Sequence, residues 1–157
     1  MAISKEDLKN TYPLPAYNYR VDIEGEPMSF SEVSGLSVAS EVTTYKESRI
    51  GGSDVGPIVM QMPAQATPPT ISLKRGIIRG DRLTYLYQWL KDAKLNLVEK
   101  RNVTISLCDE EGKPVIVWKV INAFPKKLDA PSFTSDSNDA AIETMELAAD
   151  YLFIEEA

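Results

Sequence analysis

Carboxylates, lysines and tyrosines are the side chains through which this chain could do chemistry, because it contains no histidine and one cysteine, Cys108. The absence of histidine excludes Ser-His-Asp and Cys-His catalytic pairs, histidine-ligated zinc and a histidine proton relay. A single cysteine forms neither an intrachain disulfide nor a thiolate metal cluster. Cys108 ends a strand-like run, and we expect it to fill a small buried space.

Two groups of acidic residues are the candidates for a cation site. Three adjacent carboxylates lie at Asp109 to Glu111, and Asp136 and Asp139 flank Asn138. A calcium loop needs a central glycine and a glutamate at its twelfth position, and neither group has this spacing. We interpret the first group as a solvated hairpin turn and the second as a loop, and we expect no metal and no cofactor.

A basic cluster lies in the middle of the chain, around Gly76 and Gly80. Its members are Lys74, Arg75, Arg79 and Arg82. A helix expected to start at Asp81 would offer an N-terminus to an anion there. The glycine patterns of phosphate-binding loops, GxxxxGK before Ser or Thr and GxGxxG, are absent. We therefore favour a charged corner between a strand and a helix, which pairs with the acidic C-terminal third of a neighbouring copy.

The elements that must position these residues fit one domain, since the chain has 157 residues, of which 43% are hydrophobic and 25% charged. No apolar run approaches the ~20 residues that span a bilayer, so we expect no membrane segment. The first residues lack the apolar stretch of a secretory signal, so we expect no signal peptide.

Charge is distributed unevenly along the chain. The formal net charge is −6, and residues 128–157 hold eight acids and no base. Residues 1–127 hold 15 acids and 17 bases, a net of +2. An acidic chain without a basic stripe lacks the phosphate-neutralising surface that drives nucleic-acid binding, so we expect no specific nucleic-acid partner.

An arm, several strands and one helix are predicted in the first two thirds of the chain. Residues 1–15 are expected to form an extended arm, because Pro13 and Pro15 restrict the residues before them. Apolar residues then alternate from Tyr17 to Ile23 and predict a half-buried strand. Strands are also predicted over Gly35 to Tyr45 and Thr70 to Lys74. The helix is expected over about residues 81–94, with Asp81 as N-cap and Leu83, Leu86, Tyr87 and Leu90 on its apolar face.

Residues 43–66 are expected to form a long hairpin that projects from the body. Three glycines and four prolines within residues 46–69 exclude a helix, and strand-like residues lie on both flanks. The tip is expected at Gly51-Gly52 and to be mobile. Exposed apolar residues are expected at Ile50, Val55, Ile58 and Met60. Because monomeric proteins protect such strand edges, we expect the hairpin to contact a partner.

A second hairpin is predicted in the last third of the chain, from Asn102 to Cys108 and from Val115 to Phe124, with Gly112 in its turn. Residues 125–139 are rich in proline, serine and aspartate and are expected to form a loop. Residues 140–154 fit a strand and a helix almost equally, and propensity alone favours the helix.

The residues alone therefore predict a mainly β domain with one helix and one projecting hairpin, which associates with itself and is not an enzyme. Trp89 and Trp118 are expected in the core or in an interface. An enzyme that uses carboxylates, lysine or tyrosine is the weaker alternative. Its sign would be a deep pocket in which paired carboxylates have a raised pKa.

Several segments resemble the inner-tube protein family of contractile tails, which includes the tail-tube proteins of contractile phages and the inner tubes of extracellular contractile injection systems. The resemblance covers about residues 12–153 and rests on the order and spacing of segments. These are the opening strand from Tyr17 to Val21, the run from Phe30 to Leu36, the Leu73-Lys74-Arg75-Gly76 strand, the helix around Trp89, the hairpin from Asn102 to Pro125 and the closing segment from Asp129 to Leu147.

The resemblance implies a β-barrel-like tail-tube fold of two packed antiparallel sheets over residues 16–157, and it favours a strand for residues 140–154. It implies structural roles for a set of motif residues: Gly35, Leu73, Lys74, Gly76, Trp89, Trp118, Phe124 and Pro125. It also matches Tyr45 to Met62 with the family's inter-ring stacking loop. The contact residues expected there are Tyr45, Lys46, Arg49, Ile50, Gly51, Gly52, Val55, Ile58 and Met60.

The function implied by the resemblance is mechanical. Hexameric rings stack into a hollow tube that holds cargo in its lumen, and a contracting sheath drives the tube through a target envelope. The implied partners are further copies of the chain, the sheath protein, baseplate or tube-initiator proteins and a cap protein. Assembly in the bacterial cytoplasm and release within a phage-tail-like particle are also implied.

Two alternatives remain within the same resemblance. The chain could be a tube-initiator or baseplate-adapter subunit of the same machine, which shares the fold and differs in its loops. It could instead be a ring-forming, secreted or cargo-binding tube protein of the type VI kind.

Overall fold

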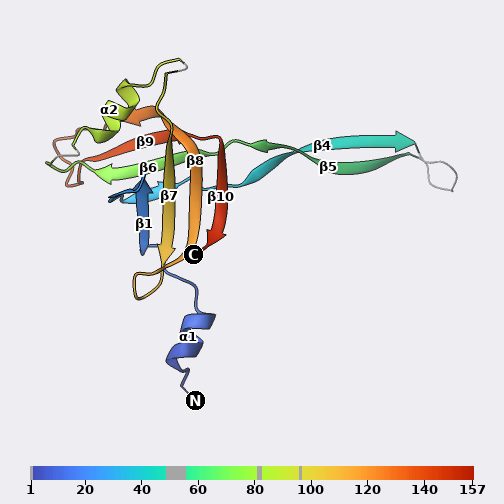
Figure 1. The fold of residues 1–157 in the computed structure, drawn as a ribbon, viewed down its shortest axis with the longest axis horizontal. Coiled ribbons are helices and arrows are strands. Elements are labelled where there is room, and N and C mark those ends of the chain that lie inside the picture. Colours follow the sequence, from blue (N-terminus) through green and yellow to red (C-terminus); the bar gives the residue numbers. More distant parts are fainter. Residues whose placement is uncertain (1, 49–55, 81–82, 96) are drawn as a thin grey trace.

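The chain folds into two antiparallel sheets that share one long strand, with a hairpin extending far from them (Figure 1). The computed structural model describes residues 2–48, 56–80, 83–95 and 97–157. Its elements are α1 (Lys5–Thr11), β1 (Tyr19–Ile23), β2 (Glu26–Met28), β3 (Glu32–Ser34), β4 (Ala39–Ser48), β5 (Pro57–Thr67), β6 (Thr70–Gly76), α2 (Tyr85–Lys91), β7 (Arg101–Cys108), β8 (Pro114–Asp129), β9 (Ile142–Ala148) and β10 (Tyr151–Glu156).

Strand β8 belongs to both sheets. Its first part, residues 114–123, pairs with β7 on one side and β10 on the other, and β7 pairs in turn with β1 and β1 with β2. Its last part, residues 124–129, pairs with β9, which is followed in the second sheet by β6 and β3. In Figure 1, β6 and β9 therefore run across the strands of the first sheet.

The change of sheet occurs at Asn122, whose φ of 55° lies in the left-handed region. Asparagine adopts this conformation more readily than most residues. The backbone N–H of Asn122 donates to Oδ1 of Asn102, and its Nδ2 donates to Oδ2 of Asp150 at 2.9 Å. Side chains from β7 and from the connection between β9 and β10 therefore hold the bend in place.

The core lies between the two sheets and extends under α2. Its largest fully buried side chains are Ile23, Ile71, Leu73, Leu86, Met145, Leu147, Val21, Val103 and Val120. The alternation of these residues along β1, β6, β7 and β9 agrees with the strand pattern in the sequence.

The main sequence predictions for the fold are confirmed. The protein is mainly β, and the long hairpin and the β7–β8 hairpin are present, the latter with Gly112 at a φ of 80°. Most of residues 140–154 lie in two strands, β9 and β10, as the family resemblance implied and against helix propensity. Both strands pair with β8, so tertiary pairing outweighs the local preference there.

The helix prediction over 81–94 is too long, because α2 spans only Tyr85–Lys91. Its N-cap is Thr84, and Asp81 lies outside the described residues. The carbonyl of Leu83 accepts a hydrogen bond from Nη2 of Arg75, which draws it away from the helix. The predicted apolar face is also partly wrong, since Leu83 and Tyr87 are about half exposed.

Two other predictions need correction. The segment expected as a loop from 125 is strand as far as Asp129, because residues 124–129 pair with β9; Pro125 lies opposite Leu147, and the register shifts between Pro125 and Lys127. The expected extended arm contains a helix, α1, capped by Ser4, whose hydroxyl accepts from the N–H of Asp7. In Figure 1, α1 lies below the strands of the first sheet and apart from both sheets.

Gly35 is the point of closest backbone approach at the base of the projecting hairpin. Its φ is +84°, and a Cβ built on it would lie 2.1 Å from the backbone oxygen of Thr70. Gly35 precedes β4 and Thr70 begins β6, so the chain leaves the body and returns to it at this contact. A residue with a side chain would force the two segments apart.

We predict that Gly35→Ala lowers the free energy of unfolding by at least ~2 kcal/mol, because it adds a backbone clash to a left-handed conformation. The matched control is Gly76→Ala, where φ is not positive and nothing lies within 4 Å of a built Cβ. This control should change stability by less than ~0.5 kcal/mol. Urea unfolding of both variants measures the difference, and equal losses would contradict the role given to Gly35.

Candidate assembly surface

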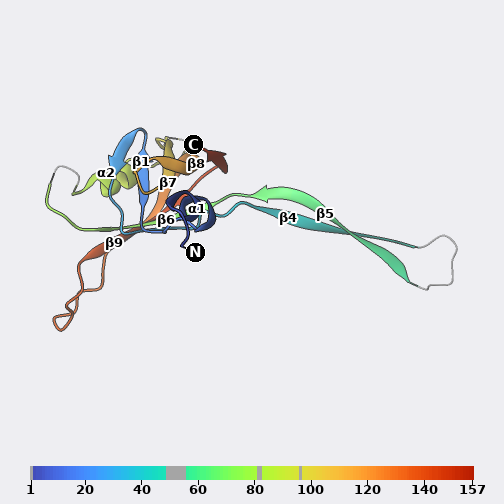
Figure 2. The same cartoon turned by 90° about the horizontal axis from the view of Figure 1, so that it is seen from below.

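Strands β4 and β5 form a two-stranded ribbon that pairs with no other described strand. At about 3.3 Å per residue, strands of 10 and 11 residues extend over ~35 Å. Every side chain of the ribbon is exposed except Ile58, which is half-buried. Figures 1 and 2 both show the ribbon standing clear of the body.

The ribbon has one apolar face. Residues opposite each other in an antiparallel pair share a face, so the register places Tyr45 with Met60, Thr43 with Met62 and Glu47 with Ile58 on one side. The apolar face is defined here as Tyr45, Ile58, Met60 and Met62.

The opposite face of the ribbon is mixed. It contains the cross-strand pairs Lys46 with Val59, Thr44 with Gln61, Val42 with Pro63 and Ser48 with Pro57. The hydroxyl of Thr44 donates to Oε1 of Gln61 at 3.0 Å. Both faces therefore carry exposed apolar side chains, but three successive positions of β5 on the first face are apolar, Ile58, Met60 and Met62, whereas Gln61 separates Val59 from Pro63 on the second.

An isolated two-stranded ribbon is marginally stable in water, because it has no face on which to bury apolar side chains. Tyr45 is 48% exposed, Met60 37% and Met62 43%. The ribbon also presents free backbone groups along both strands, although Pro57 and Pro63 interrupt the β5 side. These features make the ribbon the candidate binding surface of the chain.

The structure places four of the nine predicted stacking-loop residues. Tyr45, Ile58 and Met60 lie on the apolar face, whereas Lys46 lies on the opposite face. The other five fall outside the described residues: Arg49, Ile50, Gly51, Gly52 and Val55. Met62 was missing from the predicted set, although its alternation with Ile58 and Met60 in the sequence was the signal that could have found it.

The predicted motif residues are spread through the body. Leu73, Trp89 and Pro125 are buried, and Trp118 packs against the core from a partly exposed position. Phe124 is half-buried, with the ammonium group of Lys100 at 5.6 Å from its ring centroid.

The predicted basic cluster does not form a single site. Lys74 pairs with Glu32 at 3.2 Å on the exposed side of β6. Arg75 points into the core and pairs with Glu143 of the same chain, both side chains being largely buried. Arg79 is exposed, and Arg82 lies outside the described residues. The sequence predicted that this cluster pairs with acidic residues of a neighbouring copy. At Arg75 the structure instead has an ion pair with Glu143 of the same chain.

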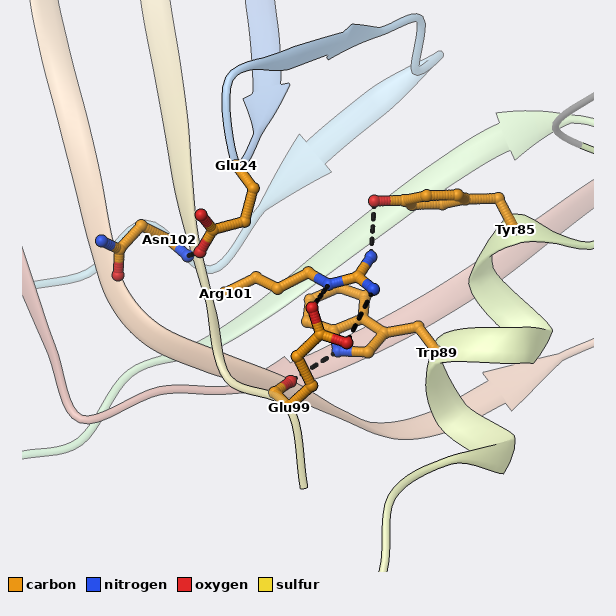
Figure 3. A network of polar contacts seen from close by, with 6 residues as sticks. All are labelled: Glu24, Tyr85, Trp89, Glu99, Arg101 and Asn102. Carbon is orange, nitrogen blue, oxygen red and sulfur yellow. Dashed lines mark hydrogen bonds and ion pairs between the residues drawn. The ribbon is translucent and has the colours of Figure 1, made fainter. Parts of the chain in front are cut away.

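Helix α2 is fastened to β7 by Arg101 (Figure 3). Its guanidinium carbon lies 4.9 Å from the ring centroid of Trp89, and its Nη1 donates to the hydroxyl of Tyr85 at 2.6 Å. Nε and Nη2 both donate to the carboxylate of Glu99 at 3.2 Å, and the indole N–H of Trp89 donates to the Glu99 carbonyl. The Arg101 guanidinium thus contacts the Trp89 ring, the Tyr85 hydroxyl and the Glu99 carboxylate at the same time.

Hydrogen bonds lower the pKa of several carboxyl groups. Arg101 lowers the pKa of Glu99, the backbone N–H of Lys113 lowers that of Asp109, and Asn122 lowers that of Asp150. Asp109 accepts from the N–H groups of both Glu111 and Lys113, so it closes the β7–β8 turn as predicted. Among the described residues, no group of three or more acidic or cysteine side chains is arranged to hold a metal ion.

Helices of the described part of the chain are also too short or too polar to cross a membrane. Cys108 is buried, as predicted from its position at a strand end.

Comparisons with known proteins agree on one family. Residues 15–153 match the family model of the T4-like virus tail tube protein gp19. No protein with a curated description matches the chain.

Among solved structures, the chain is similar to a chain of the PVC sheath–tube complex, an extracellular contractile injection system in its extended state. The identity is 32%, the TM-score is 0.87, and the match covers 99% of this chain and 100% of the other. A chain of the tube-terminating cap of the anti-feeding prophage is 34% identical with a TM-score of 0.81, over the full length of both chains. Hcp1 from Flavobacterium johnsoniae shares the fold at 14% identity and a TM-score of 0.50, covering 88% of this chain and 95% of Hcp1.

We predict that Arg101→Lys lowers the free energy of unfolding by about 1–2 kcal/mol, because lysine keeps the charge but loses the stacking on Trp89 and the Tyr85 hydrogen bond. Unfolding followed by tryptophan fluorescence measures the loss. Glu99→Gln is the control and should change stability much less, because the Glu99 side chain is 64% exposed. A larger loss in Glu99→Gln than in Arg101→Lys would contradict this account.

Proposed function

The chain belongs to the T4-like virus tail tube protein family, and on that premise we propose that its copies form hexameric rings that stack into a hollow tube. The tube is the inner tube of a contractile injection system or contractile phage tail. It is driven through a target envelope by the contraction of a surrounding sheath, and its lumen carries cargo.

The observation that carries this proposal is the ribbon, whose apolar face has no partner among the described residues of its own subunit. An exposed ribbon of this kind needs a second surface to become stable. If that surface belongs to another copy, every copy has one ribbon to offer and one surface to accept it. Such a head-to-tail contact does not close on itself along the stacking direction, and it gives a filament.

The proposed partners follow from the similar structures. Those contain the sheath around the tube, the terminating cap and the terminator of the sheath and tube, at 32% to 34% identity over more than nine-tenths of this chain. We propose equivalent contacts with sheath, cap and baseplate for this protein, together with assembly in the bacterial cytoplasm and release within the particle. The subunit acts mechanically and not as an enzyme.

A tube-initiator or baseplate-adapter role is the alternative within the same machine. A chain of the anti-feeding prophage baseplate is 24% identical, against 34% for the cap structure, and at 24% the likeness speaks for the fold alone. Tubes formed by the purified protein without a baseplate would favour the main tube subunit. A secreted type VI-like role would instead give rings that do not stack.

We predict that purified wild-type protein forms rings or tubes with an open centre in negative-stain electron microscopy, and that Met60→Asp abolishes stacking. The carboxylate places a charge in the apolar face, while Met60 is 37% exposed in the subunit, so the fold should tolerate it. Val59→Asp is the matched control, because Val59 is the adjacent residue, is 52% exposed and lies on the opposite face.

Comparing the two variants shows whether stacking is lost because the charge lies on the apolar face or because any aspartate in the ribbon disturbs assembly. Val59→Asp should keep stacking, and both variants should melt like the wild type as monomers. Tubes of Met60→Asp as abundant as those of the wild type, or equal loss in both variants, would refute the assignment of the apolar face. Wild-type protein that forms neither rings nor tubes, alone or on a baseplate fragment, would refute the proposed function.

A further inference from the structure

The N-terminal arm, residues 2–13, is held to the body by very little. All of its residues are exposed, and α1 buries none of its side chains. An ion pair ties α1 to the β7–β8 turn, between Lys9 and Glu111 at 3.6 Å, and both side chains are more than half exposed. Ion pairs in water contribute little to stability, because solvent screens them. The arm can therefore leave the turn at small cost.

The apolar side of α1 faces a hollow and packs on no surface. Leu8 and Tyr12 lie one helical turn apart, and both line a hollow of about 500 Å³ between α1 and the β7–β8 turn. Leu8 is 36% exposed and Tyr12 57%. A helix of seven residues is too short to be stable by itself in water. A surface that covered these two side chains would therefore stabilise α1.

An apolar groove of about 410 Å³ lies where the arm enters the body. Leu14 is the first half-buried residue after the arm, and it lies at this groove. A groove of this size admits a few side chains and not a folded domain. Its apolar lining is half-buried and comes from β1, β3, β7, β8 and the segment before β4: Tyr19, Val33, Leu107, Trp118 and Leu36.

The arm reaches the groove from its present attachment. Leu14 already lines the groove, and Tyr12 is two residues away, a distance of at most ~7 Å along the chain. Pro15 keeps Leu14 extended, and the ring of Pro13 fixes its own φ. The ψ angle of Pro13 is therefore the torsion that can turn α1 from the β7–β8 turn towards the groove.

We propose that the N-terminal arm is a strap that closes over this groove in the free subunit, with Leu8 and Tyr12 packed against Leu36, Leu107 and Trp118. The structure shows the strap open, with α1 beside the β7–β8 turn. Closure buries the apolar side of α1 and the lining of the groove together, whereas the open position leaves both exposed. The contact given up is one solvent-exposed ion pair, so burial of apolar surface decides the balance.

A closed strap keeps free subunits apart. Exposed apolar surface promotes association with other chains, and the strap hides such a surface until the subunit joins an assembly. This consequence rests on the proposed function, because it concerns subunits that have yet to enter a tube. Closure itself takes place within one chain and does not depend on that function.

The test is acrylamide quenching of tryptophan fluorescence, on subunits kept dilute enough to sediment as monomers. Trp89 is 2% exposed and Trp118 lines the groove, so quenching reports chiefly on Trp118. A double variant, Leu8→Ser with Tyr12→Ser, removes the side chains that close the strap. We expect a higher quenching constant and a red-shifted emission than in the wild type. Both residues are exposed in the open position, so the fold should tolerate the change.

The matched control is Lys9→Ala, a change in the same helix with a different expected effect. It removes the ion pair that holds the strap open and keeps Leu8 and Tyr12. Its quenching constant should therefore equal that of the wild type or fall below it. Glu111→Gln removes the same ion pair from the side of the body and should behave in the same way.

Three results would overturn closure of the strap. The first is equal quenching in the wild type and the double variant, because neither Leu8 nor Tyr12 lines the groove in the open position. The second is an increase in Lys9→Ala as large as that in the double variant. The third is wild-type quenching that rises on dilution, which would show that the groove is covered by another copy.

The role in assembly has its own measurement. The double variant should associate at a lower concentration than the wild type in sedimentation velocity, and an unchanged concentration would overturn that role. Failure of the wild-type protein to form rings or tubes would overturn the proposed function and leave closure of the strap, which is measured on monomers, standing.

Discussion

A two-stranded β ribbon is at best marginally stable by itself in water, and this constraint governs the molecule. Strands β4 and β5 carry an apolar row that no described part of their own subunit covers. The subunit therefore has its own buried core, but the apolar row of its ribbon is left exposed. Association with another copy would cover this apolar row.

The body is organised to hold the ribbon at a fixed point. Both ends of the ribbon enter the body beside Gly35 and Thr70, where the backbones are too close for a side chain. The sheet that receives them is joined to the other through β8, which bends at Asn122. Arg75 and Arg101 fix α2 and the segment before it on the body. The backbone pairing of β3 with β6, β6 with β9 and β9 with β8 therefore connects the base of the ribbon to both sheets.

Periodicity was enough to predict most of the strands, because alternation in β1, β6 and β7 reflects one buried face. The resemblance to tube proteins was needed for β9, whose residues fit a helix as well. Local sequence could not show that Arg75 would bind the carbonyl of Leu83 and shorten α2, or that Pro125 would pair with Leu147 of β9, since both depend on partners elsewhere in the chain. For the ribbon, the sequence predicted exposure and apolar content. The division into two faces needed the register, which pairs Tyr45 with Met60 and sets Lys46 on the other side.

Amide hydrogen exchange tests the central claim most directly, since it reports where backbone hydrogen bonds open. In the isolated subunit, the amides of β4 and β5 should exchange much faster than those of β6, β7 and β9, and after assembly they should become protected while the core strands change little. Ribbon amides as protected in the isolated subunit as those of the core would show that the ribbon needs no partner. Ribbon amides that still exchange rapidly in assembled tubes would show that the partner binds elsewhere, and either result would contradict the account.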